Sequence, residues 1–240
     1  MLSLALLVLK HQYSARIVPS TELPESWLSP EINGRATPVD PNQFKRAEPI
    51  IRRETRRYPP AVLKRNLKAV HVVKSIWFFG APYGGTNDND TVYLSIDSLQ
   101  RGYTSDYIAR SFHHEFSSIL LRNFPSYLDQ AAWKATLPKG FQYGSGGVDA
   151  IKQGNSSTDF DAAEAARGFY SKYSLAEQEE DFNILAENVF MGGSEFWKSV
   201  DNYPRLKAKV KLVLNFYNRV DSSFTEPSLR AAPIPRLTYN

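Results

Sequence analysis

The stretch Ser111–Leu121, with the sequence SFHHEFSSILL, decides how this chain of 240 residues is interpreted. His114 and Glu115 occupy the first two positions of a His-Glu-x-x-His pattern, in which two histidines one helical turn apart bind the same zinc ion. Ser118 stands four residues after His114, where the second histidine is expected. The stretch therefore predicts a metal-binding helix in which one expected ligand is replaced.

The spacing of apolar side chains predicts that this stretch is helical. Thr104–Asp106 offers N-cap side chains, and Asn123 and Pro125 mark the end of the helix. Between them the apolar residues recur at intervals of three and four: Ile108, Phe112, Phe116, Ile119 and Leu120. Side chains four residues apart on a helix differ by about 40° in direction, so His114 and Ser118 would face one metal ion.

The chemistry of this face depends on what the neighbouring residues can donate. Glu115 is placed to act as general base on water at the open position of a three-ligand zinc site. Ser118 has a neutral hydroxyl, which is a poor zinc ligand and could at most orient a metal-bound water. His113 points about 100° away from His114, so both reach one metal only if the helix is distorted. The alternative is a core helix whose histidines are satisfied by hydrogen bonds.

A second segment with an acidic helix completes a recognisable pattern. Gly168-Phe169-Tyr170-Ser171-Lys172-Tyr173 is followed by Glu179-Glu180-Asp181-Phe182 and a predicted helix to Phe190. Together with the first helix, this resembles the gluzincin-like zinc-binding metallopeptidases that are often bacterial surface lipoproteins. In that family a His-Glu-x-x-His helix precedes a Gly-Phe-x-x-x-Tyr segment and a Glu-Asp-Phe helix. Taken alone, the acidic residues would indicate the solvated face of a surface helix.

The resemblance covers roughly residues 91–220 and implies an α+β, zincin-like domain with a small sheet, a metal-site helix and a second helix that carries the glutamate ligand. It implies zinc as cofactor and these roles: His114 as first ligand, Glu180 as glutamate ligand, Glu115 as general base and Tyr173 as the tyrosine before the second helix, a candidate donor to an oxyanion. His113 and Ser118 remain secondary candidates at the metal. Ser118 departs from the family pattern, and so does Ile184, where a second acidic residue is usual.

Two functional hypotheses follow, because the sequence matches the family pattern at some positions and departs from it at others. The first is a zinc-dependent peptidase that hydrolyses peptide bonds of a peptide or protein substrate through a metal-activated water. The second is a catalytically degenerate zincin-like module that binds peptides or an extracytoplasmic partner. The sequence leaves open whether the protein is an enzyme.

Composition limits the remaining function classes. The net charge of +4 arises from 29 basic and 25 acidic residues, too small an excess to indicate nucleic-acid binding. The absence of cysteine excludes disulfides, thiolate metal sites and cysteine nucleophiles. Only four histidines are present, and His71 is a reserve ligand. It lies in Ala69–Phe79, a predicted buried strand, where a histidine is more often packed in the core.

The N-terminal part of the chain differs from the rest in its composition. We expect residues 1–68 to form a partly irregular arm rich in proline and charge, and residues 69–240 to form the zincin-like domain. Leu2–Leu9 is an imperfect export signal or a first strand. Any membrane association would depend on that leader, and we expect an extracytoplasmic location, periplasmic or secreted. Thr91–Ser98 is a predicted strand, either an edge that pairs with substrate or an ordinary sheet strand, after a loop at Tyr83–Asp88.

Overall fold

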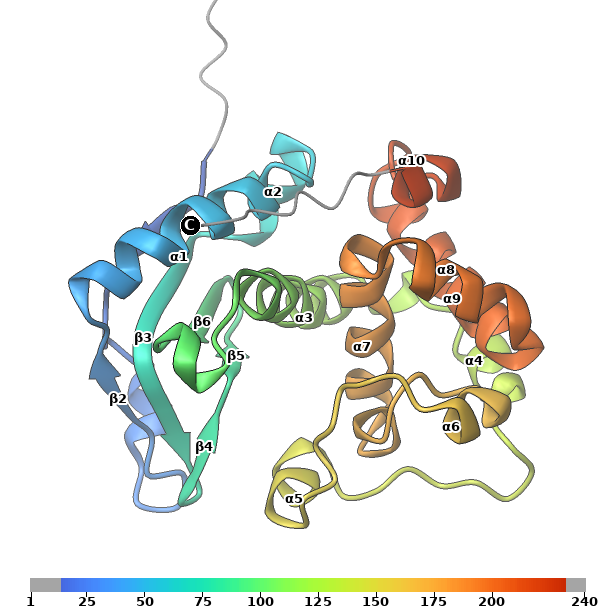
Figure 1. Ribbon diagram of the computed structural model, residues 1–240, viewed down its shortest axis with the longest axis horizontal. Helices are drawn as coiled ribbons and strands as arrows, with labels where there is room; N and C mark the ends of the chain where they lie inside the picture. The colour runs from blue at the N-terminus through green and yellow to red at the C-terminus, as the bar shows by residue number, and fades with distance from the viewer. Residues whose placement is uncertain (1–13, 232–240) are drawn as a thin grey trace, which may run out of the picture.

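A computed structural model describes residues 14–231, and these residues form a mixed sheet beside a larger group of helices (Figure 1). The strands are β1 (Arg16–Val18), β2 (Arg35–Pro38), β3 (Ala69–Phe78), β4 (Ala81–Tyr83), β5 (Gly85–Asn87) and β6 (Thr91–Ser95). The helices are α1 (Pro41–Thr55), α2 (Pro60–Asn66), α3 (Ser105–Asn123), α4 (Gln130–Thr136), α5 (Gly147–Lys152), α6 (Ala162–Arg167), α7 (Gln178–Met191), α8 (Gly193–Asn202), α9 (Pro204–Val220) and α10 (Glu226–Ala231). The expected α+β class is confirmed.

The long strand β3 organises the sheet. It pairs in parallel with β1 on one side and β6 on the other, while β2 and β4 pair with it antiparallel near its end. β5 lies antiparallel to β6, so the main order is β1-β3-β6-β5. All five side chains of β6 are buried, as expected for a strand covered on both sides.

The two predicted strands are present, and the structure decides between the two alternatives for the second. Strand β6 begins at the predicted Thr91 and is an ordinary sheet strand, because β5 pairs with its outer side and removes it from the edge. β5 falls in the segment predicted as a loop, because Gly85 and Asn87 are turn-forming residues and Thr86 is the only β-branched residue of this short strand. The edge strand nearest α3 is therefore β5.

The expectation of an irregular arm is wrong for much of residues 14–66. The Asp40 side chain accepts hydrogen bonds from the backbone N–H groups of Asn42 and Gln43 and so caps α1. Ala47, Ile50 and Ile51 are fully buried at helical spacing, and α1 packs against α3 and β1. Proline and charge obscured this pattern. The expected leader or strand at Leu2–Leu9 lies outside the described residues.

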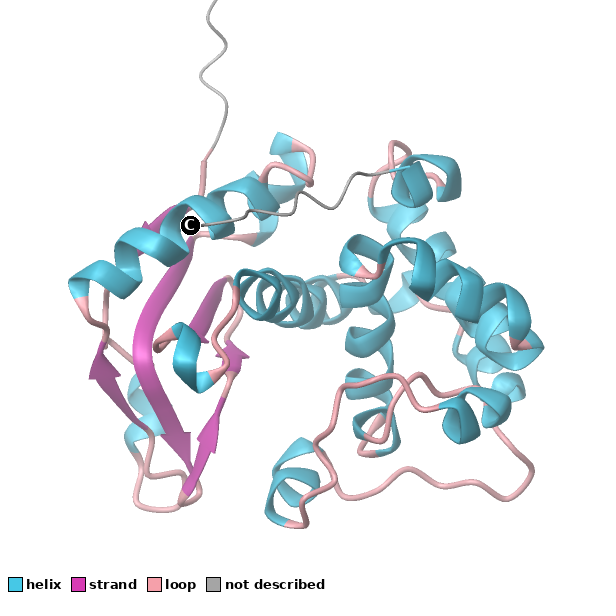
Figure 2. Ribbon diagram, viewed as in Figure 1, coloured by secondary structure: helices cyan, strands magenta, loops and turns pink. Residues whose placement is uncertain are grey.

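The helices α3 and α7 connect the sheet to the helical half of the molecule (Figure 2). α3 begins after Thr104, whose hydroxyl accepts from the Tyr107 N–H, and packs against β5 and β6. α7 is buried at every residue from Asp181 to Met191 and is surrounded by α3, α8 and α9. The centre of the molecule is thus the α3–α7 interface.

Within residues 14–231 no helix combines the length and apolar character that a membrane span requires.

Candidate functional site

His114 of α3 is held between two carboxylates of α7. Its Nε2 atom lies 2.9 Å from Oε2 of Glu180, and its Nδ1 atom lies 3.0 Å from Oε2 of Glu187, two helical turns further along α7. Burial favours the neutral ring, but the hydrogen bonds and charges of the two glutamates outweigh burial and raise the pKa of His114 well above 6.5. The ring is therefore an imidazolium that donates from both nitrogens.

Tyr173 completes the surroundings of Glu180. Its hydroxyl donates to Oε1 of Glu180 over 2.9 Å, from the short 3-10 helix Tyr173–Leu175 that precedes α7. Burial, and then the charge of Glu180, raise the pKa of this phenol, so it remains a donor. Gly147 lies against the pair, because a Cβ at this position would come within 2.5 Å of the Tyr173 hydroxyl and 2.6 Å of Glu180 Oε1.

Glu115 lies on the sheet side of the same group. Asn87 of β5 donates from its side-chain nitrogen to Oε2 of Glu115 over 2.8 Å. Burial raises the pKa of Glu115 to about 7; His114 and Asn87 oppose this rise, and the charges of Glu180 and Glu179 add to it. A carboxyl group with this pKa can exchange a proton near neutral pH, which suits a general acid or base.

Ser118 does not face an open metal position. Its hydroxyl accepts from the side-chain nitrogen of Asn183 over 2.7 Å, and Ser117 donates to the amide oxygen of Asn183 over 2.5 Å. The serines and the asparagine are buried and join α3 to α7. The place of the expected second histidine is thus occupied by a hydrogen bond between the helices.

His113 and His71 do not join this group. The Nδ1 atom of His113 lies 2.8 Å from the Tyr58 hydroxyl and its Nε2 atom 3.1 Å from Glu54, on the side of α3 that faces α1. His71 lies on the sheet, with Nδ1 3.3 Å from the carbonyl oxygen of Glu22. The expected secondary role of His113 at the metal is corrected, because its ring is fully buried against Tyr58 and Glu54, away from His114 and Glu180.

Sequence reasoning missed three residues of the site. Glu187 follows Glu180 by seven residues and therefore lies on the same face of α7, a spacing that could have indicated its role. Asn183 lies one turn after Glu180 on α7, but its hydrogen bond to Ser118 joins two helices, and spacing along either helix does not indicate it. Asn87 could not have been found, because its strand has no sequence signal.

The donors do not fit a three-ligand zinc site. Catalytic zinc takes three protein ligands and keeps one open position. The part of the chain that the structure describes has no group of three His, Cys, Asp or Glu side chains arranged to hold a metal ion. His114 Nε2 and Glu180 converge as two donors, but Ser118 is occupied by Asn183. The third ligand has no counterpart here.

A cleft opens onto these residues. Two adjoining hollows of about 360 and 250 Å³ share His114, Glu115 and Tyr173 among their lining residues. One wall is the turn and strand from Tyr83 to Asn87, and the other includes Gly147. In the described chain β5 pairs only with β6, so its outer backbone edge borders the cleft. The arrangement offers an unpaired strand edge next to a polar, mainly acidic floor.

Comparison with known proteins supports the fold. Neither a protein family model nor a curated protein matches the sequence. Among solved structures, the chain is similar to the crystal structure of a "putative zinc-binding metallo-peptidase" from Bacteroides caccae, with a TM-score of 0.57 and 16% identity. The match covers 95% of this chain and 89% of that one. At this identity the likeness shows a shared fold.

Proposed function

We propose that this protein is a zincin-like binding module that takes an extended peptide segment into the cleft beside β5 without hydrolysing it. The observation that carries this proposal is the hydrogen bond of 2.7 Å between Ser118 and Asn183, at the position where a zinc peptidase has its second histidine. Both nitrogens of His114 are also engaged by carboxylates. The polar side chains at this centre therefore satisfy one another's hydrogen bonds, which supports a binding role.

The strand edge supports a peptide as the ligand. An extended chain can add to an open sheet edge through backbone hydrogen bonds, while its alternate side chains enter pockets beside the edge. β5 supplies such an edge, and its residues Gly85, Thr86 and Asn87 all line the cleft. Tyr173 and Glu180 on the opposite wall offer contacts to the side chains of a bound segment.

A zinc-dependent peptidase is the second candidate, and one observation favours it. His114 Nε2 and Glu180 converge, and Glu187 contacts the other ring nitrogen, as an outer carboxylate commonly does for a zinc-bound histidine. Glu115, with a pKa of about 7, is placed beside them as a base. We rank this candidate second because the Ser118 hydroxyl, at the position of the expected second histidine, is already bonded to Asn183.

Metal content and peptide turnover separate the two candidates. The protein is purified without chelator, its zinc is measured by mass spectrometry, and a library of unstructured peptides is tested for binding and for cleavage products. We expect far less than one zinc per chain and saturable binding without cleavage. One zinc per chain that is lost in His114→Ala, together with cleavage, would establish the peptidase instead. No peptide binding in any arm would overturn the proposed module.

A further inference from the structure

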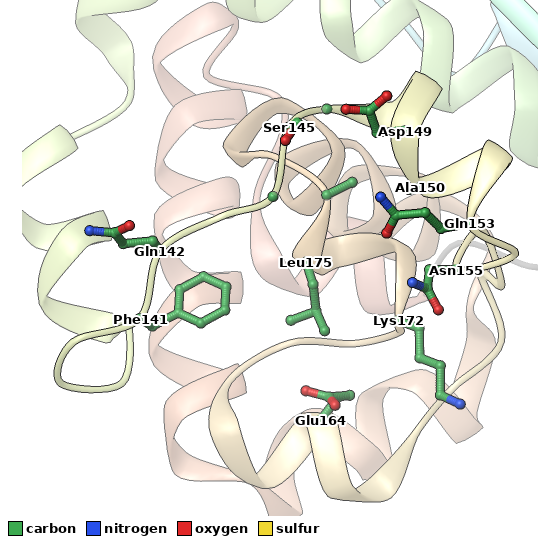
Figure 3. A pocket seen from close by; sticks show the side chains of 13 residues that line it. Phe141, Gln142, Ser145, Asp149, Ala150, Gln153, Asn155, Glu164, Lys172 and Leu175 are labelled. Atoms are coloured by element: carbon green, nitrogen blue, oxygen red, sulfur yellow. The ribbon is translucent and has the colours of Figure 1, made fainter.

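A second hollow, of about 430 Å³, is lined by the residues drawn in Figure 3, and none of them lines the cleft. The helix α5 forms the wall between them: Gly147, Val148 and Ile151 line the cleft, whereas Asp149, Ala150 and Gln153 line this hollow. Its size lies in the range of sites for small organic ligands, roughly 300–1,000 Å³. Nothing in the peptide-binding proposal uses it.

The floor of the hollow is apolar and partly fixed in place. Phe141 and Leu175 lie near its centre in Figure 3. The Phe141 ring packs on Phe169 at 4.7 Å between centroids, and the guanidinium of Arg167 lies 5.8 Å from the same ring. These contacts hold the aromatic side chain in position before any ligand arrives, which lowers the entropy cost of binding.

Polar side chains surround this floor on several sides (Figure 3). They are Gln142, Ser145, Asp149, Gln153, Asn155 and Lys172. Among residues 14–231 none of these side chains forms a hydrogen bond or ion pair with another residue. Glu164 also lines the hollow, and its Oε2 atom accepts from Arg167 over 2.7 Å. The rim thus presents amides, a hydroxyl, carboxylates and one ammonium group that are free to bind a ligand.

The distribution of these groups limits the chemistry of the ligand. A phosphate or sulfate is disfavoured, because Lys172 is the single cation of the lining and Asp149 and Glu164 repel an anion. A fatty acyl chain is disfavoured, because polar groups surround the floor and would lose water without gaining partners. Side chains that both donate and accept, placed around an apolar floor, complement a ring with a hydrocarbon face and hydroxyl groups along its edge.

We propose that this hollow binds a neutral saccharide unit, with one face of the sugar ring on Phe141 and Leu175 and its hydroxyl groups on the polar rim. Asp149 and Glu164 would accept hydrogen bonds from hydroxyl groups, and the amides of Gln142, Gln153 and Asn155 would donate or accept as the sugar requires. The site is independent of the cleft and of any metal, so it would exist in either candidate function.

The side-chain amides provide a direct test. The ¹⁵N-labelled full chain is titrated with methyl glycosides of glucose, galactose and N-acetylglucosamine and with their disaccharides, and the NH₂ resonances of Gln142, Gln153 and Asn155 are followed. We expect at least one of these sugars to shift all three with a dissociation constant in about the millimolar range. The NH₂ resonance of Gln100, an exposed residue that does not line the hollow, should not shift. No shift with any sugar, or equal shifts at Gln100, would overturn the proposal.

Matched variants then locate the binding. Asp149→Ala and Gln153→Ala should each reduce the affinity for the sugar by about tenfold, because each variant removes a polar partner of the ligand. Lys152→Ala removes an exposed side chain of α5 outside the lining and should leave binding unchanged. Inorganic phosphate serves as a competing probe, and competition by phosphate would identify an anion site and contradict the proposal. Peptide binding is measured on the same variants, so loss of the sugar site alone leaves the cleft function standing.

Discussion

The Nε2 atom of His114 lies 2.9 Å from the Oε2 atom of Glu180, across the interface between α3 and α7. The two residues are 66 positions apart in the chain, and the 3-10 helix at Tyr173 and the packing of α7 bring them together. Glu187 contacts the other ring nitrogen, so a ring with a raised pKa joins the two helices, and several consequences can be measured.

Replacing Glu187 with glutamine should lower the pKa of His114. The amide can still accept from Nδ1, but the negative charge that favours the imidazolium is lost. Because the folded pKa of His114 is raised, its contribution to stability is full below about 6.5 and is lost as the pH rises through the folded value. Glu187→Gln should move this loss to lower pH. The histidine resonances in an NMR titration report the change, and Glu195→Gln, at an exposed site, is the control.

A gain of zinc affinity is expected when the missing ligand is restored. Ser118→His places an imidazole one turn after His114, and Asn183→Ala removes the buried amide that would otherwise crowd it. The double variant should bind zinc at least about tenfold more tightly than Asn183→Ala alone, as measured by calorimetry. Equal affinities would mean that Glu180 is not oriented toward a shared cation.

The sequence predicted those helices and strands that have clear capping residues or a clear pattern of apolar residues. The helix from Thr104 to Asn123 and the strand beginning at Ala69 were found from caps and apolar periodicity. Helix α1 was missed because Pro49 and the arginines hide its apolar face. The pairing of Ser118 with Asn183 depends on two helices that meet only in the folded chain, so spacing alone could not predict it.

A buried ion pair next to Glu180 should be one of the most sensitive points of the fold. Lys209 of α9 donates to Asp181 over 2.6 Å, and both side chains are fully buried. Asp181→Ala leaves a buried ammonium without its partner and should cost about 3–5 kcal/mol of unfolding free energy. The double variant Asp181→Leu with Lys209→Met removes both charges and should cost clearly less. Urea unfolding compares the two, and an equal or larger loss in the double variant would contradict this account.

Gly147→Ala should damage the site more than the fold. The new methyl group would lie 2.5 Å from the Tyr173 hydroxyl, which is the end of a side chain and can move aside. The substitution should therefore weaken the hydrogen bond from Tyr173 to Glu180 and leave the backbone in place. We expect a melting temperature within about 5 °C of the parent and peptide affinity reduced by about tenfold. Tyr173→Phe, which removes the same hydrogen bond, should match it.

Acid sensitivity should originate at Glu54, on the opposite side of α3 from the cleft. Burial raises the pKa of this carboxyl, but the hydrogen bond and charge of His113, with Arg57 and Arg53, outweigh burial and lower the pKa to about 2. Because the folded pKa lies below the unfolded value of about 4.3, the stabilisation is present above that value and is lost as the pH falls toward 2.

The loss between these limits should be about 3 kcal/mol, from roughly two pKa units at 1.36 kcal/mol each. Glu54→Gln should be less stable at pH 7 but should lose less stability between pH 5 and pH 3 than the parent. Urea unfolding at a series of pH values measures both slopes, with Glu195→Gln as an exposed control. Parallel slopes in the parent and Glu54→Gln would show that acid denaturation begins elsewhere, because the buried carboxylate would then contribute no linkage between protonation and folding.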